Sequence, residues 1–182
     1  MKRRTLLGLL AFGPFFSHVH GQPKTAKGIK EMQDNWKDLL APGTPVPNAA
    51  EELKLPKDEW KKRLQPASYS VLREEDTERA GTSPLNAEKR PGVFACAGCG
   101  LPIFTSEMKY ESGTGWPSFF TFIPGTLQTK TDYKIIYPRT EYHCAKCGGH
   151  QGHVFDDGPA PTGKRYCNNG VALKFIPKDG KA

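Results

Sequence analysis

The sequence predicts a mainly β protein whose sheets are preceded by short helices. The chain of 182 residues contains 16 prolines and 19 glycines, which is typical of short strands and many turns rather than of a helix bundle. From Gly92 onward the apolar residues recur with a period of two, whereas helical spacing is confined to the earlier part of the chain. These two observations define the expected fold class.

Three short helices are predicted before residue 92. The first covers residues 25–40 and ends at APGTPVPNA (41–49), where prolines remove backbone hydrogen-bond donors. The second covers residues 58–64, with Asp58 as the candidate N-cap. A third is expected within ASYSVLREEDTERA (67–80).

Strand-like runs separated by glycine or proline turns make up the rest of the chain. They cover residues 93–95, 119–123, 133–137, 153–155 and 171–175.

The first 21 residues have the layout of an export signal. A basic start is followed by an apolar stretch at 6–16 that is too short to span a membrane, and then by small and polar residues. Arg3 and Arg4 also resemble a twin-arginine signal, with an ordinary secretory signal as the alternative. We expect an exported, periplasmic protein with a helical, proline-rich extension at 22–57 and one domain at 58–182.

The formal net charge is +7, and three of the positive charges lie in the predicted signal. The other charges of both signs are scattered in runs such as EDTER and KDEWKKR, which indicates a solvated surface. No nucleic-acid partner is therefore expected. The mean hydropathy of −0.58 is typical of a water-soluble chain.

Two Cys-x-x-Cys pairs, each followed by glycine, occur in FACAGCGLPIF and YHCAKCGGH. Two intervening residues let both sulfurs of a pair face one ion, and the glycine accepts the positive φ of the turn. Together the pairs predict a closed, structural zinc site that links two hairpins, with the ligands Cys96, Cys99, Cys144 and Cys147. Disulfides are one alternative, but cross-pairing would not explain both trailing glycines. A rubredoxin-like iron site is the other, but the rest of the chain offers no site for an electron-transfer partner.

This assignment leaves Cys167 as an unpaired thiol in KRYCNNGVAL. In an extended strand Arg165 and Asn169 share its face. A guanidinium beside the sulfur should lower the pKa of the thiol from about 8.5, and the Asn169 amide could donate to a developing oxyanion. A buried, inert thiol is the alternative.

Two more stretches hold candidate site residues. In GGHQGHVFDDGP, His150 and His153 could bind metal, act as acid and base, or lie on the surface, with Asp157 behind them. In ESGTGWPSF, glycines and a proline hold Trp116 in a rigid loop, either as an apolar wall for a small group or as core packing.

Taken together, these motifs resemble the methionine-(R)-sulfoxide reductases of the B type. CxxCG, SGTGWPSF, CxxCGGHxGHVFDDGP, TGxRYCxN and the closing Val-Ala-Leu-Lys-Phe stand in family order over roughly Asp58 to Ile176. The resemblance implies a fold of antiparallel sheets and makes the four paired cysteines zinc ligands. It makes Cys167 the catalytic nucleophile and Trp116 the residue that packs against the S-methyl group of the substrate. It assigns the active-site polar roles to His150, His153, Asp157, Arg165 and Asn169.

The implied reaction reduces the R epimer of methionine sulfoxide, with proteins as the expected substrates. The thiolate of Cys167 attacks the sulfoxide sulfur, His150 or His153 supplies a proton with Asp157 orienting it, and the enzyme is left as a sulfenic acid. A non-catalytic zinc scaffold is the alternative function. A thiol peroxidase is disfavoured because Lys164 occupies the position where that class has threonine.

The chain departs from the family pattern at three positions. Thr114 stands where many members have a second, resolving cysteine, so we expect a one-cysteine enzyme that a thioredoxin-like protein or a small thiol regenerates. Asn168 replaces the apolar residue that usually follows the nucleophile, and Gln151 stands where leucine is common. Both are expected to alter the pocket rim. We expect the protein to act as a monomer.

Overall fold

A computed structural model describes residues 25–134 and 137–181 of the chain. The predicted export signal at 1–21 lies outside the described residues. The helices are α1 (Ala26–Asp34), α2 (Lys57–Arg63) and α3 (Pro66–Glu74), with short 3-10 turns at η1 (Trp36–Leu39), η2 (Pro84–Asn86), η3 (Ser106–Met108) and η4 (Gly170–Ala172). The strands are β1 (Gly92–Cys96), β2 (Pro102–Thr105), β3 (Lys109–Tyr110), β4 (Ser118–Phe119), β5 (Leu127–Asp132), β6 (Arg139–Cys144), β7 (His150–Phe155), β8 (Arg165–Asn168) and β9 (Leu173–Pro177). None of the helices in this part of the chain has the length and apolar content needed to cross a membrane.

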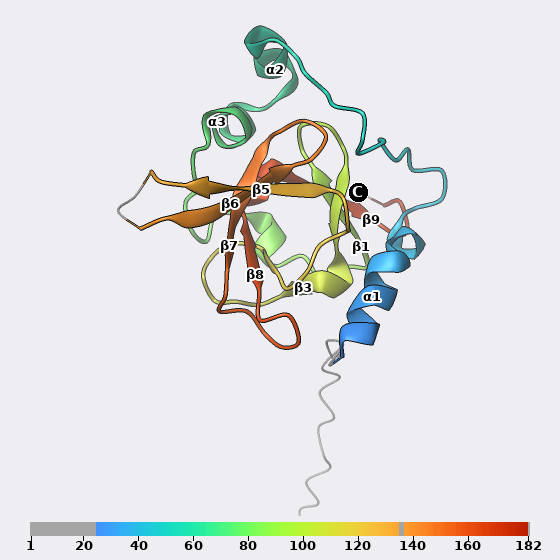
Figure 1. Cartoon of the computed structure of the whole chain (residues 1–182). Coiled ribbons are helices and arrows are strands. Elements are labelled where there is room, and N and C mark those ends of the chain that lie inside the picture. The colour runs from blue at the N-terminus through green and yellow to red at the C-terminus, as the bar shows by residue number, and fades with distance from the viewer. Residues whose placement is uncertain (1–24, 135–136, 182) are drawn as a thin grey trace, which may run out of the picture.

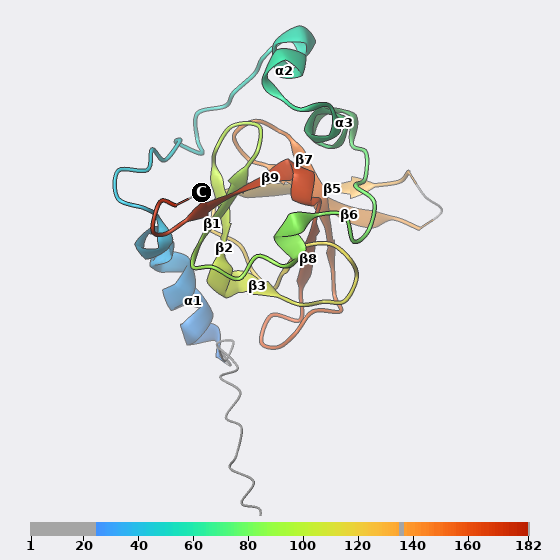
Figure 2. The same ribbon diagram turned by 180° about the vertical axis from the view of Figure 1, so that it is seen from behind.

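The strands form two antiparallel sheets. One sheet has three strands in the order β2-β1-β9, and the other has six in the order β3-β4-β8-β7-β6-β5. Every strand pair is antiparallel, and the helices lie around the sheets rather than between strands (Figures 1 and 2). The predicted class, mainly β with antiparallel sheets after short helices, is confirmed.

The predicted helices are confirmed with corrected ends. The first breaks at Asn35 into α1 and η1, and α3 ends at Glu75, which adopts a left-handed backbone conformation with φ 56°. The expected N-cap of α2 is wrong. Pro56 holds that position without a side-chain hydrogen bond, and Asp58 lies inside the first turn, where a negative charge suits the helix dipole.

Three strand predictions are corrected. In the run at 171–175 the first two residues belong to η4, and β9 begins at Leu173. The run at 119–123 supplies only the second residue of β4. In the run at 133–137, the described residues 133, 134 and 137 are not part of a strand, and 135–136 lie outside the described residues. The turn there begins at Asp132, whose carboxylate accepts a hydrogen bond from the Lys134 backbone N–H at 2.7 Å. Such a side-chain contact two residues on competes with strand pairing.

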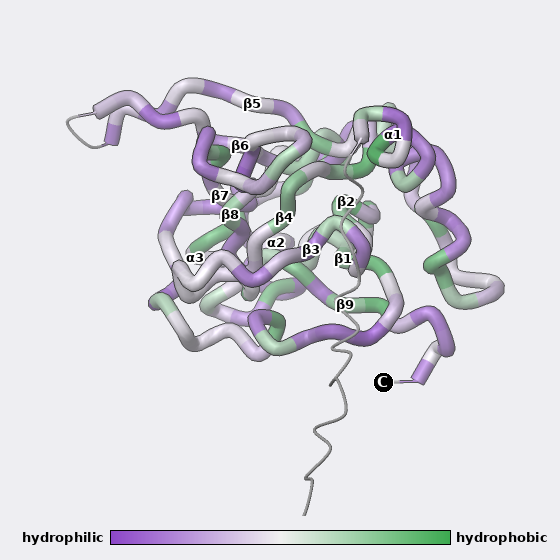
Figure 3. The backbone as a smooth tube through the Cα atoms, turned by 90° about the horizontal axis from the view of Figure 1, so that it is seen from below, coloured by the Kyte–Doolittle hydropathy of each residue, from purple (hydrophilic) through white to green (hydrophobic). Residues whose placement is uncertain are grey.

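An aromatic core joins the two sheets. The rings of Phe104 on β2 and Phe119 on β4 stack with centroids 3.9 Å apart, and Phe94 on β1 meets Phe119 edge-on at 5.1 Å. All three side chains are fully buried. Apolar residues gather on β1, β2 and β9, while the β5 hairpin is largely polar (Figure 3). This packing fixes the position of β4, which is the strand that lies beside Cys167.

The N-terminal extension packs against the domain at two places. In α1 the Gln33 amide donates to the Thr121 hydroxyl at 2.8 Å and to the Phe122 carbonyl at 3.1 Å. Farther along, the Leu53 N–H donates to the carbonyl of Lys146, and the Lys146 ammonium donates to the Glu51 carbonyl, both at 2.7 Å. The intervening segment runs along the outside of the sheets (Figure 1).

Candidate active site and metal centre

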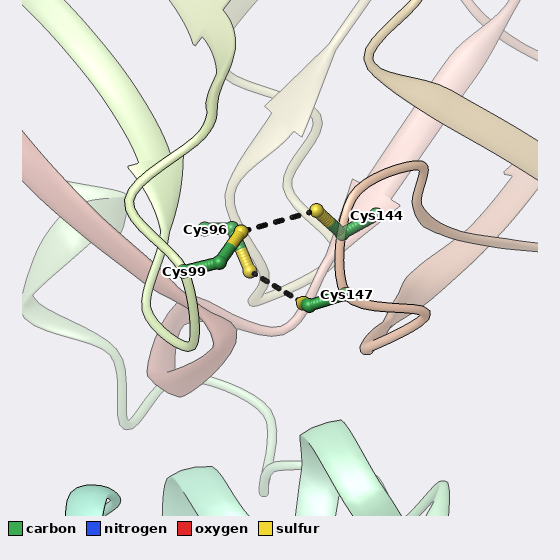
Figure 4. Close-up of side chains that lie close together, drawn as sticks. All are labelled: Cys96, Cys99, Cys144 and Cys147. Carbon is green, nitrogen blue, oxygen red and sulfur yellow. Dashed lines mark hydrogen bonds between the residues drawn. The ribbon is translucent and has the colours of Figure 1, made fainter. Parts of the chain in front are cut away.

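Two turns bring the four paired cysteines together. Their sulfurs all lie within 4.8 Å of one another, with Cys96 and Cys147 at 3.7 Å and Cys99 and Cys144 at 3.5 Å (Figure 4). Tetrahedral coordination with metal–sulfur bonds of about 2.3 Å places sulfurs about 3.8 Å apart, so the cluster fits a four-thiolate metal site. A disulfide needs about 2.05 Å, and none forms among the five cysteines, all of which are described.

The backbone of each turn explains the glycine after each pair. Gly100 and Gly148 have φ of +78° and +65°, and each N–H donates to the carbonyl of the first cysteine in its pair at 2.8 Å. A residue with Cβ adopts this left-handed conformation at a cost. Both pairs therefore form the same tight turn, one on each sheet, and a metal there would join the two sheets.

Helices α2 and α3 cover one side of this cluster. The Arg73 guanidinium donates to the Cys147 carbonyl at 3.0 Å and lies over the Trp60 ring. A Cβ added at Gly149 would lie 2.9 Å from the Leu72 side chain, so α3 packs directly on the second turn. The cluster is mostly buried and leaves no open coordination position for a substrate.

Cys167 lies on the third strand of the six-stranded sheet and is not one of the four clustered cysteines. It is half-buried on β8, where His153 on β7 and Ser118 on β4 are its direct partners across the two neighbouring strands. Directly opposed residues of antiparallel strands place their side chains on the same face. The sheet thus brings the thiol, an imidazole and the end of the tryptophan loop together.

Arg165 lies on the same face of β8, but its charge is already paired. Its Nε and Nη2 each donate to one oxygen of the Asp157 carboxylate at 2.8 Å. The expectation that Asp157 orients a histidine is therefore corrected, because this carboxylate faces the guanidinium instead. Arg165 also lies over the ring of Phe155, 4.3 Å from its centroid, which fixes the orientation of the guanidinium.

The predicted lowering of the thiol pKa is wrong for the free protein. Burial raises the pKa of the Cys167 thiol above its ordinary value, although the charge of Arg165 and hydrogen bonds from Thr114 and Arg165 act in the opposite direction. Desolvation disfavours the charged thiolate, and the Asp157 carboxylate adds a smaller effect in the same direction. Ionisation of this thiol therefore needs further help from the site.

That help lies in a carboxylate that sequence reasoning missed. The Asp132 carboxylate lies 2.7 Å from Nε2 of His153 and accepts from Arg139 at 2.6 Å. The pKa of Asp132 lies well below its usual range. The largest cause is the hydrogen bond from the Lys134 backbone N–H, and the contacts with His153 and Arg139 act in the same direction, against the effect of burial. Asp132 is 21 residues from His153, and only the pairing of β5, β6 and β7 brings them together.

The protonation state of His153 follows from these contacts. Burial lowers the pKa of His153 below its ordinary value, despite the opposing effect of Asp132, so the ring is neutral at neutral pH. An ionised carboxylate can only accept a hydrogen bond, so Nε2 carries the proton and Nδ1 keeps a free lone pair. In this tautomer His153 can act as a base.

His150 is more deeply placed than His153. Its side chain is 2% exposed, against 12% for His153, and its Nδ1 lies 3.0 Å from the buried Glu141 carboxylate. Neither ring nitrogen of His150 has a hydrogen-bond partner among the described residues. The two rings are 5.4 Å apart between centroids. Accessibility therefore favours His153 over His150 for proton transfer.

The other two candidate residues, Trp116 and Asn169, make hydrogen bonds that hold the tryptophan loop and the end of β8 in place. Trp116 donates through its indole N–H to the Glu78 carbonyl at 2.9 Å. Asn169 lies just beyond β8, where its amide donates to the Gln151 carbonyl at 3.0 Å and its side-chain oxygen accepts from the Glu78 N–H. Its predicted hydrogen bond to a developing oxyanion stays a prediction.

Gln151 and Asn168 do not lie at the pocket rim, which corrects the expectation for both. Both side chains are fully buried, and the Asn168 amide donates to the Gln151 side-chain oxygen at 3.4 Å. Asn168 also accepts from the Tyr142 hydroxyl at 2.9 Å, and the Gln151 amide donates to the Cys96 sulfur at 3.4 Å. The two departures from the family pattern thus form one buried network.

Comparison with known proteins identifies the family of this chain. A family model described as "SelR domain" matches residues 64–177, more than half of the chain. This chain belongs to the SelR-domain family, the B-type methionine-R-sulfoxide reductases. The family match lies within the predicted domain and leaves the N-terminal extension outside it.

Relatives of this SelR-domain protein come from distant organisms. It is 49% identical over 122 residues to the peptide methionine sulfoxide reductase MsrB of Methanosarcina barkeri, covering 66% of this chain and 86% of that one. It is 49% identical over 115 residues to MsrB of Leptospira interrogans, covering 63% and 88%. It is 52% identical over 115 residues to the chloroplastic peptide methionine sulfoxide reductase B1 of Arabidopsis thaliana, covering 63% of this chain and 57% of that longer one.

Proposed function

We propose that this protein reduces the R epimer of methionine sulfoxide in proteins, with Cys167 as the nucleophile. The observation that carries the proposal is the placement of Cys167, half-buried and directly across from His153 on the neighbouring strand. Membership of the reductase family supports the reaction class. The tryptophan loop enters the same face through Ser118.

The first step is ionisation of the thiol. Nδ1 of His153 accepts the Cys167 proton, and the Asp132 carboxylate on Nε2 stabilises the imidazolium that forms. The raised pKa of the thiol makes such a base necessary at neutral pH. Asp132 therefore takes the orienting role that the sequence assigned to Asp157.

The second step transfers oxygen. The Cys167 thiolate attacks the sulfoxide sulfur while the His153 imidazolium returns its proton to the sulfoxide oxygen. The sulfur–oxygen bond of the substrate breaks and a new one forms at Cys167, so methionine leaves and the enzyme holds a sulfenic acid. The substrate sulfur gains the two electrons that the cysteine sulfur loses.

Trp116 supplies stereochemical selection. Its ring is held by the hydrogen bond to the Glu78 carbonyl, and its backbone lies between Gly115 and Pro117, so it can form a fixed wall for the S-methyl group. A fixed methyl group leaves one face of the chiral sulfur toward the thiolate, which favours one epimer. Arg165 and Asp157 complete the polar side of the site.

An external thiol regenerates the enzyme. The four other cysteines are gathered in the metal cluster, so Cys167 has no resolving partner in the chain. A thioredoxin-like protein or a small thiol would attack the sulfenic sulfur with loss of water, and a second thiol would release Cys167. This is a one-cysteine reductase.

The four-thiolate cluster is best suited to zinc held as a structural ion. Cys96, Cys99, Cys144 and Cys147 would bind it, and the ion would join the two sheets without entering the reaction. We further propose export to the periplasm, from the pattern of residues 1–21, and action as a monomer. Sequencing the N-terminus of the mature protein would test the proposed signal.

The deciding assay incubates the purified protein with each epimer of a methionine sulfoxide peptide and dithiothreitol. We expect turnover of the R epimer alone, and none with Cys167→Ser, which should keep its zinc content and fold. No turnover of either epimer by the wild-type protein would favour the zinc-scaffold alternative. Substantial activity in Cys167→Ser would refute the assigned nucleophile.

A further inference from the structure

Three hydroxyl groups lie in a hydrogen-bonded row beside the nucleophile. The Ser112 hydroxyl is 2.9 Å from that of Thr114 and 2.7 Å from that of Ser118. The Ser118 hydroxyl can also donate to the Trp116 carbonyl at 3.1 Å. At the other end of the row, the Thr114 side chain lies near enough to Cys167 to lower the pKa of the thiol. The row therefore connects the reacting sulfur to a backbone carbonyl.

The fold holds this row in place. Ser118 is fully buried and directly opposite Cys167 across β4 and β8. Gly113 and Gly115 have φ of +74° and +93°, so the loop turns back on itself and brings the Thr114 hydroxyl to that of Ser112. The Gly115 carbonyl accepts from the Gly81 N–H at 2.8 Å and from the Asn86 amide at 2.9 Å, which anchors the loop.

Each hydroxyl has one hydrogen, so the row can run in only two directions. With Cys167 as a thiol, its S–H donates to Thr114, and the row continues through Ser112 to Ser118 and ends at the Trp116 carbonyl. With Cys167 as a thiolate, the sulfur can only accept. Ser118 then donates to Ser112, Ser112 to Thr114, and Thr114 to the sulfur. Both directions use the same oxygen positions.

We propose that Thr114 is a further catalytic residue, which donates a hydrogen bond to the Cys167 thiolate, and that Ser112 and Ser118 position and polarise it. This deepens the proposed function and rests on Cys167 being its nucleophile. A hydrogen bond to an ionised group is stronger than one to its neutral form, and donors in a row strengthen one another. Thr114, which stands where many family members have a resolving cysteine, thus activates the nucleophilic Cys167.

Several other groups act on the same sulfur, and the test must separate them from Thr114. Charged and titratable neighbours come from four elements and one loop: Arg165 on β8, His153 on β7, Tyr142 on β6, Tyr110 on β3, and Asp157 after β7. A hydroxyl-to-methyl exchange at Thr114 changes none of these charges. Its effect on ionisation therefore reports the hydrogen bond.

The experiment measures the rate of Cys167 alkylation by iodoacetamide against pH in the zinc-loaded full chain. The variants are Thr114→Val, which keeps the shape and removes the donor, and Thr114→Ser, which keeps the donor. We expect Thr114→Val to raise the apparent pKa of Cys167 by about one unit, or roughly tenfold in thiolate at lower pH. Thr114→Ser should keep the wild-type profile, and Ser112→Ala should shift it in the same direction by less.

Zinc content and the unfolding midpoint serve as controls for the fold. A folded Thr114→Val protein with the wild-type alkylation profile would overturn the proposal, even if its reductase activity were low. Should Thr114→Val lose zinc or unfold, Ser112→Ala decides, and an unshifted profile there overturns the proposal equally. The readout uses no sulfoxide, so failure of the proposed reductase function would appear separately, as absent turnover in the wild-type protein.

Discussion

The buried pair of Gln151 and Asn168 offers a sharp test of how this core is held together. We consider the exchanges Gln151→Leu and Asn168→Ile, alone and combined, which restore the apolar character that the family resemblance leads one to expect at both positions. Both side chains are fully buried, so no water replaces a lost partner. Each single exchange strands polar atoms that the double exchange removes.

The hydrogen bonds set the magnitudes. Gln151→Leu removes the bond to the Cys96 sulfur and leaves the Asn168 amide with its remaining acceptor, the Asn169 carbonyl at 2.8 Å, so we expect a loss of about 1–2 kcal/mol of stability. Asn168→Ile strands both the Gln151 side-chain oxygen and the Tyr142 hydroxyl, which should cost about 2–4 kcal/mol. In the double variant only the Tyr142 hydroxyl is stranded, so the two effects should fall short of additivity by about 1–2 kcal/mol.

Urea unfolding at one fixed free zinc concentration provides the assay, because bound metal contributes to the measured stability. A third exchange serves as the control. Tyr142→Phe should destabilise the wild-type protein by removing a hydrogen bond, but should be neutral or stabilising beside Asn168→Ile, where the hydroxyl is already stranded. Additivity of the two exchanges within about 0.5 kcal/mol would refute the reasoning, since it would mean that the side chains do not interact.

Three further predictions concern the metal cluster, the loss of stability at low pH and the catalytic imidazole. Cys144→Ser should lose zinc and unfold, because metal binding and folding are one equilibrium; full stability by circular dichroism without bound metal would count against a structural ion. The pKa of Glu75 is lowered to about 2 by hydrogen bonds to two lysines, so its contribution to stability is present above its ordinary value of 4.5 and is lost as the pH falls toward 2. Glu75→Gln should therefore flatten the decline of the urea midpoint in that window, and an unchanged slope would contradict the assignment. Asp132→Asn should lower kcat at neutral pH roughly tenfold or more while leaving zinc content intact, since His153 loses the carboxylate that stabilises its charged form; wild-type turnover at all pH values would show that Asp132 only shapes the hairpin.

The amino-acid sequence alone was sufficient for features that depend on neighbouring residues. The spacing within each Cys-x-x-Cys pair and the glycine after it determine a tight turn with both sulfurs on one side, wherever that turn lies. The period of two after Gly92 predicted a β protein, and the prolines at 41–49 predicted the end of the first helix. Such features need only the backbone preferences of a few consecutive residues.

Contacts between distant residues had to wait for the tertiary structure, because strand register decides them. The carboxylate on His153 comes from Asp132 at a hairpin end rather than from Asp157, which pairs with Arg165. Burial under the neighbouring strands, which no local pattern reports, raises the pKa of Cys167 where the adjacent arginine predicted a fall. The cysteines could be recognised in the sequence, but the electrostatics that govern the reactive one follow from the packing of the whole sheet.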